Sequence, residues 1–160
     1  MDYIEIKQKL IDMLIVDLQK QLKSYVNEMK KAQEEANYHK GAMQSRYDTF
    51  KEEAQTLKDG FARQYQNTSD LLLSLTQYKS IISINTTNKV TVGSLVFITE
   101  NDKDKQYYIL PDILYTIIEL NDIKFECISS HTPLAKSLLG KEIGDEVNFN
   151  QMLFEITAIV

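Results

Sequence analysis

The first 78 residues carry an apolar repeat that leaves few choices of fold. Over residues 11–36, and again over residues 43–61 and 68–78, apolar side chains recur at alternating intervals of four and three residues. This spacing is typical of helices wound together as a coiled coil. Only Gly41 and Gly60 interrupt the segment, and it contains no proline. The sequence therefore predicts two long helices with few breaks between them.

A chain reversal at residues 37–42 predicts an intramolecular antiparallel hairpin with a definite register. In that register small side chains face large ones at three layers, which fills the space between the helices without strain. A parallel coil between two chains would give no reason for this complementarity, so we expect a monomer. The predicted layers are Ala36–Met43, Ala32–Tyr47, Met29–Phe50, Tyr25–Ala54, Leu22–Leu57 and Leu18–Phe61.

The second half of the chain has the turn and helix-cap signals of a β-rich domain. Asn121-Asp122 is a hairpin signal, and Ser130 or Thr132 is suited to cap a short helix that has Pro133 at its first position and Gly140 just past its end. Strand-like segments cover residues 90–99, 105–110, 114–120, 123–128, 145–150 and 152–160. The expected fold class is α+β, with an antiparallel sheet carrying one short helix. The expected organisation is a hairpin at 1–78 with its tip at about 34–43, a linker at 79–89 and a sheet domain at 90–160.

Composition excludes several classes of protein. No apolar run reaches the roughly 18–20 residues that span a bilayer, and the charged N-terminal segment does not read as a signal peptide. The single Cys127 is expected to be a buried thiol in a reducing cytoplasm. Residues 1–78 hold 11 basic and 12 acidic residues, and residues 79–160 hold 7 and 11. Neither half has the basic excess of a direct nucleic-acid binder, so any nucleic acid is expected to be reached through a partner protein.

Three stretches of the second half resemble the C-terminal domain of the bacterial Gre transcript-cleavage factors: "VGSLVFIT", "ISSHTPLAKSLLGKEIGDEVNF" and "FEITAIV". At the hairpin tip, "EEANYH" is similar to the Gre element "ENAEYH". The resemblance implies an FKBP-like fold for the C-terminal domain. The positions that match the family motif are Pro133, Leu134, Ala135, Leu138, Leu139, Gly140, Lys141, Gly144, Asp145 and Val147, with Thr132 where serine is usual.

The resemblance also implies a mechanism and a partner. Gre factors dock on bacterial RNA polymerase and insert their coiled coil through its secondary channel, where tip carboxylates assist a Mg²⁺ ion that cleaves backtracked RNA. Here Glu34 and Glu35 would supply the carboxylates, while Asn37, Tyr38, His39 and Lys40 would contact the polymerase complex. The protein would stimulate the polymerase's nuclease without being an enzyme itself. It would need no cofactor and would hold no metal stably when free.

The tip also departs from the family pattern. Cleavage-active members carry an acid three positions before the residue matching Glu34, and here that position is Lys31. Glu35 can converge with Glu34 only if the helix has unwound, because adjacent helical residues point about 100° apart. Asp48 would lie beside the Ala32–Tyr47 layer, over one turn below the tip. The alternative interpretation of the two glutamates is an ordinary solvated helix face.

Other functions remain open at this point. Lys31 favours a regulator that occupies the polymerase channel without supporting cleavage, or one that competes with active Gre factors. A peptidyl-prolyl isomerase would need an aromatic-lined pocket, yet the aromatic residues of the second half mostly alternate along strands, as core residues do. A structural adapter would leave the tip chemistry unexplained. For Lys141 and Asp145 we expect turn formation and a local ion pair.

Overall fold

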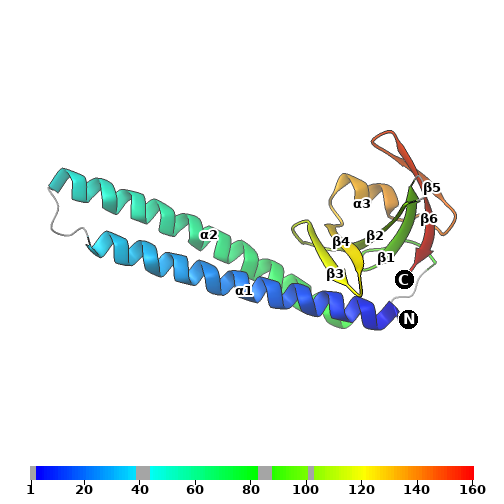
Figure 1. Ribbon diagram of the computed structural model, residues 1–160, viewed down its shortest axis with the longest axis horizontal. Helices are drawn as coiled ribbons and strands as arrows, with labels where there is room; N and C mark the ends of the chain where they lie inside the picture. Colours follow the sequence, from blue (N-terminus) through cyan, green and yellow to red (C-terminus); the bar gives the residue numbers. More distant parts are fainter. Residues whose placement is uncertain (1–2, 39–43, 83–87, 101–102) are drawn as a thin grey trace. The chain divides into compact units, whose positions relative to one another are not determined.

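The computed structural model describes residues 3–38, 44–82, 88–100 and 103–160. Two long helices, α1 (Tyr3–Tyr38) and α2 (Gln44–Ile82), precede the strands, as Figure 1 shows. The remaining elements are β1 (Leu95–Glu100), β2 (Lys103–Leu110), β3 (Thr116–Leu120), β4 (Ile123–Ser129), α3 (Pro133–Leu138), β5 (Glu146–Phe149) and β6 (Met152–Ile159).

The described chain divides into two compact units whose boundaries fall within the long helices. The hairpin unit is Ile15–Leu73, and the sheet unit combines Met1–Leu14 with Ser74–Val160. The sheet unit therefore contains the first turns of α1 and the last turns of α2 as well as every strand. This partition differs from one drawn between a purely helical first half and a purely β-rich second half.

The hairpin unit confirms the antiparallel helix pair that the apolar repeat predicts. Leu18, Ala32 and Thr68 are buried, and Tyr25 and Phe61 are half-buried, so the expected positions face the partner helix. The rings of Tyr25 and Phe61 lie 6.4 Å apart between centroids. A hydrogen bond from the Lys58 Nζ to the Gln33 Oε1, 3.0 Å long, also joins the two helices.

The register of the hairpin is one heptad away from the predicted one. Tyr25 faces Phe61 rather than Ala54, and Ala36 shares a groove with Phe50. The predicted partner of Ala36, Met43, lies outside the described residues. A shift of seven residues returns every side chain to the same helix face, so the apolar pattern cannot distinguish the two registers. The choice made from small-to-large complementarity was wrong.

The strands form a sheet with the order β3-β4-β2-β1-β6-β5 among the described residues. Its pairs are antiparallel except β2 with β4, which run parallel, with Tyr108 beside Cys127. Asn121 and Asp122 both have positive φ angles, 53° and 62°, as a two-residue turn of type I′ requires. The predicted α+β class is confirmed, and the parallel pair adds to it.

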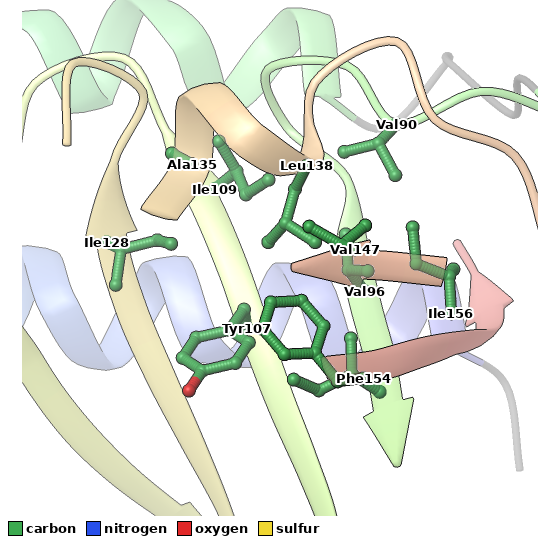
Figure 2. Packing of buried hydrophobic residues seen from close by; sticks show 11 residues of the cluster. Val90, Val96, Tyr107, Ile109, Ile128, Ala135, Leu138, Val147, Phe154 and Ile156 are labelled. Atoms are coloured by element: carbon green, nitrogen blue, oxygen red, sulfur yellow. The ribbon is translucent and has the colours of Figure 1, made fainter. Parts of the chain in front are cut away.

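One face of the sheet packs against α3 (Figure 2). Leu138 and Ala135 of this short helix are fully buried and lie over side chains from the central strands. The buried cluster comprises Val90, Val96, Ile98, Tyr107, Ile109, Ile128, Ala135, Leu138, Val147, Phe154 and Ile156. Several predicted strand aromatics are therefore core residues, as their alternation indicates.

The opposite face of the sheet carries Tyr108 and Cys127 and meets the helix segments of its own unit. The ring of Tyr3 on α1 contacts Phe97 edge to face, with centroids 5.4 Å apart. The Tyr78 hydroxyl on α2 donates to the Val92 carbonyl at 2.9 Å. Ile6, Leu10, Ile11, Leu14 and Leu75 are buried in these helix segments. The sheet is thus covered on both faces.

Candidate functional site

Glu34 and Glu35 lie on α1, within its last five residues, and the helix is intact there. Both are exposed, and within the described chain no side-chain hydrogen bond or ion pair involves either carboxylate. Because the helix continues to Tyr38, the two side chains project about 100° apart around it. They do not converge on one point, and unwinding of α1 at this position is not observed.

Glu35 faces the groove between the two helices. The groove has a volume of about 190 Å³, and its lining includes Ala32, Ala36 and Leu57 as well as Glu35 and Glu53. The register places the Glu53 carboxylate of α2 at the same groove, which the predicted register would not have done. Glu53 is therefore an acidic neighbour of the tip that sequence reasoning missed, because recognising it requires the correct heptad.

Asp48 lies closer to the tip than its predicted depth. Phe50 shares the groove with Ala36, so Asp48, two residues earlier in α2, lies roughly 3 Å further towards the turn, at 1.5 Å per helical residue. That height is close to Tyr38, the last residue of α1. The one-heptad shift thus corrects the expectation that Asp48 sits over one turn below the tip.

Lys31, the residue that replaces an acid of the family pattern, is paired. Its ammonium lies 2.7 Å from the Glu28 Oε1, one turn earlier on α1. The pair is exposed, so its contribution to the free energy of unfolding is small, about 0.2–0.5 kcal/mol. The ion pair matters because it sets the direction in which the Lys31 side chain points.

The remaining tip residues are only partly described. Asn37 and Tyr38 are exposed at the end of α1, and the Tyr38 side chain is 87% exposed. His39 and Lys40 lie outside the described residues. Asn37, Tyr38, His39 and Lys40 stay predictions as contact residues.

The family-motif residues of the sheet unit form α3 and the turn that follows it. Thr132 is the helix N-cap, and its hydroxyl accepts a hydrogen bond of 3.2 Å from the Ala135 N–H, as predicted. Pro133 occupies the first helical turn. Gly140, with φ of +81°, reverses the chain after the helix. Its N–H donates to the Val90 carbonyl at 2.8 Å.

The second part of the motif is a tight turn into β5. Gly144 has φ of +88°, and its N–H donates to the Ile156 carbonyl at 2.8 Å. The Asp145 carboxylate accepts a 2.9 Å hydrogen bond from the Glu142 N–H and so closes the turn. The structure confirms turn formation by Asp145, but within the described residues no ion pair joins it to Lys141. These residues serve the fold of the sheet unit.

The sheet unit also buries polar groups between the helices and the sheet. Lys7 is 5% exposed, and its Nζ donates to the Val160 carbonyl at 3.1 Å; burial lowers the pKa of this lysine. Burial raises the pKa of the Cys127 thiol to about 12, so it stays protonated at neutral pH. The Tyr108 hydroxyl is buried, with no hydrogen-bond partner in the part of the chain that the structure describes. Its pKa is raised, first by burial and then by nearby Cys127 and Tyr78.

The sequence of the sheet unit is similar to a known family domain. Residues 85–159 match the family model described as "Transcription elongation factor, GreA/GreB, C-term". Over these residues, just under half of the chain, the sequence is similar to the C-terminal domain of the GreA/GreB family. The family domain therefore comprises the six strands, α3 and the motif turn, and it includes both faces of the sheet described above.

Individual relatives agree with the family match. Over 66 residues the chain is 44% identical to "Transcription elongation factor GreA" of Nautilia profundicola, with 39% of this chain and 36% of the relative covered. The chain thus spans about a third of the length of the curated relative it matches.

Among solved structures, the chain is similar to GreA factor homolog 1 of Thermus thermophilus, at 16% identity and a TM-score of 0.35, covering 91% of this chain and 94% of that one. It is also similar to Gfh1 of Thermus aquaticus, at 18% identity and a TM-score of 0.37, covering 89% and 91%. At these scores the likeness does not bear on function.

Two further observations bound the chemistry. Within the described residues no helix has a stretch long and apolar enough to cross a bilayer. No group of three or more His, Cys, Asp or Glu side chains is gathered as a metal site in that part of the chain. Glu34 and Glu35 alone offer fewer oxygens than Mg²⁺ requires, so they fit a metal only as a supplement to ligands from elsewhere.

Proposed function

We propose that this protein is a transcription elongation factor that binds bacterial RNA polymerase and stimulates cleavage of backtracked RNA by the polymerase active site. The carrying observation is the match of residues 85–159 to the GreA/GreB C-terminal domain, in a chain that also forms a helical hairpin with exposed carboxylates near the end of α1. The sheet unit docks on the polymerase, and the hairpin enters the secondary channel. The protein acts there in the cytoplasm, and it meets nucleic acid only within the complex.

The tip carboxylates, Glu34 and Glu35, supply negative charge where a second Mg²⁺ is bound by few ligands. In a two-metal site this ion helps to stabilise the attacking and leaving oxygens of the displaced phosphate. Because the two side chains diverge on an intact helix, Glu34 is the primary candidate to face that ion. Glu35 faces the interhelical groove with Glu53 and adds to the negative field there.

The test uses a stalled, backtracked elongation complex to which the full chain is added. We expect short RNA fragments from the 3′ end with wild type, and their loss with Glu34→Ala at unchanged polymerase binding. Glu34 is exposed and not in the helix interface, so the substitution should alter the free energy of unfolding by less than about 0.5 kcal/mol. Glu5→Ala, which removes an exposed glutamate of α1 in the other unit, is the matched control and should cleave like wild type.

The results separate the proposal from its rivals. Cleavage that survives Glu34→Ala would mean that another carboxylate carries the reaction. Polymerase binding without any cleavage would favour the alternative function, a regulator that occupies the channel without supporting cleavage. Absence of binding would refute the partner itself.

A further inference from the structure

The pairing of Lys31 with Glu28 has a consequence for the carboxylates beside it. Lys31 stands three residues before Glu34 and four before Glu35, and side chains at these spacings are neighbours on a helix. An ammonium that bonded either carboxylate would neutralise it and would repel a divalent cation there. Lys31 therefore has two directions available along α1, and they have opposite effects on the tip.

In the structure Lys31 takes the direction away from the tip. Its Nζ is 2.7 Å from the Glu28 Oε1, and no ion pair reaches Glu34 or Glu35 within the described residues. Two physical preferences support this choice. Helical side chains lean towards the N-terminus, and an acid that precedes its lysine interacts more favourably than one that follows it.

Glu28 is also the less exposed member of the pair. Its side chain is 37% exposed, against 69% for Lys31. A half-buried carboxylate keeps fewer rotamers open than a fully exposed one, so less side-chain entropy is lost when Lys31 pairs with it. Pairing with the less exposed acid is thus favoured for a long, exposed lysine.

We infer that Glu28 is a positioning residue, which holds the Lys31 ammonium away from Glu34 and Glu35 and so leaves these carboxylates available to a divalent cation. The inference rests on the proposed function for its consequence in cleavage, but the pairing itself is a property of the free protein. It also reconciles Lys31 with a cleavage factor, because a lysine held by Glu28 does not occupy the tip.

The first experiment measures the pairing without polymerase. Carboxylate carbon chemical shifts of Glu34 and Glu35 are recorded at neutral pH for wild type and Glu28→Gln. With Glu28 neutralised, Lys31 should turn towards the tip and at least one of the two signals should move. In Glu28→Gln/Lys31→Gln the signals should match those of Lys31→Gln. The matched control is Glu5→Gln, which removes the 2.8 Å pair with Lys9 elsewhere on α1 and should change neither signal.

The second experiment measures cleavage as a function of Mg²⁺ concentration. Glu28→Gln should raise the Mg²⁺ concentration for half-maximal cleavage about twofold, the size expected for one exposed helical ion pair, with full cleavage restored at saturating Mg²⁺. In the Lys31→Gln background the same substitution should have no effect, because the lysine through which Glu28 acts is gone. A purely structural role for Glu28 would change cleavage at all Mg²⁺ concentrations.

The outcomes distinguish failure of the inference from failure of the proposed function. Unmoved carboxylate signals in Glu28→Gln, or an effect that persists without Lys31, would overturn the inference. Moved signals, together with the absence of cleavage in every variant, would uphold the positioning by Glu28 and refute the cleavage function.

Discussion

Replacing Tyr108 by phenylalanine should stabilise the sheet unit. Tyr108 is fully buried, and among the described residues its hydroxyl has no hydrogen-bond partner. Leaving such a group without water or a partner costs about 1–3 kcal/mol. Phenylalanine removes this cost but leaves a small gap where the oxygen lay, which forfeits some dispersion contacts. We therefore expect the free energy of unfolding to rise by about 1 kcal/mol, which is about 2–4 °C in Tm for a chain of this length.

The assay can follow the sheet unit alone, because the chain has a single cysteine and it is buried there. Cys127 is 0% exposed, so its reaction with a maleimide during a urea titration reports unfolding of the sheet around it. The midpoint should move to higher urea in Tyr108→Phe with an unchanged slope, because the surface exposed on unfolding is the same.

A matched tyrosine gives the control of opposite sign. Tyr78→Phe removes the hydrogen bond of 2.9 Å to the Val92 carbonyl and should lower the free energy of unfolding by about 1 kcal/mol. Should Tyr108→Phe prove no more stable than wild type, its hydroxyl is satisfied in solution and the reasoning from its burial is refuted.

Three further predictions concern other parts of the chain. Gly60→Ala should stabilise α2 by about 1 kcal/mol in thermal denaturation, since a Cβ there meets no atom within 4 Å; a loss would indicate strain. Cysteines replacing Tyr25 and Phe61 should crosslink within one chain, unlike cysteines at 25 and 54; the reverse would restore the predicted register. Burial raises the Cys127 pKa from 9.0 to about 12, so above about pH 9 the folded chain retains a proton that the unfolded chain loses. The free energy of unfolding should therefore fall as pH rises above about 9, and it should fall less in Cys127→Ala. A urea midpoint of the wild type that stays the same at each pH would contradict this.

Much of the fold was predictable because local signals agreed with one another. The four-three apolar spacing predicted the helix pair, Asn121-Asp122 predicted a two-residue turn, and Thr132 predicted a helix start; each depends on physics within a few residues. The parallel pairing of β2 with β4 was not predicted, because it joins strands that are separated by a third strand in the sequence. Alternation along a strand says which face is buried, not which neighbour it has.

The register of the hairpin and the covering of the second sheet face by α1 and α2 were not predicted, because both depend on residues far apart in the sequence. A heptad shift preserves every face of the hairpin, so the correct partner of Tyr25 could not be read from spacing. The sequence does contain a signal that α1 packs against the sheet. Near its start α1 has a second apolar stripe, Ile6, Leu10 and Leu14, beside the coiled-coil positions Ile11 and Ile15. A helix with two apolar stripes has two surfaces to bury.

The geometry around the predicted site residues could not be read from the sequence. The resemblance named Glu34 and Glu35, and the structure places both on an intact helix. The resemblance could not predict the orientation of Lys31 or the presence of Glu53 at the groove that Glu35 lines. Each of these depends on rotamers and on the register of α2, which the tip sequence does not contain.

The sheet unit is assembled from segments that a ribosome makes far apart in time. Residues 3–14 are synthesised before any of the strands, yet the sheet that buries Ile6, Leu10 and Leu14 is complete only when β6 has been synthesised. The apolar side chains at the start of α1 therefore stay exposed while the hairpin and then the strands are synthesised. During this interval they are a natural binding site for a chaperone. Closure of the sheet unit is then a cooperative event, which joins a helix segment made before the hairpin to strands made after it.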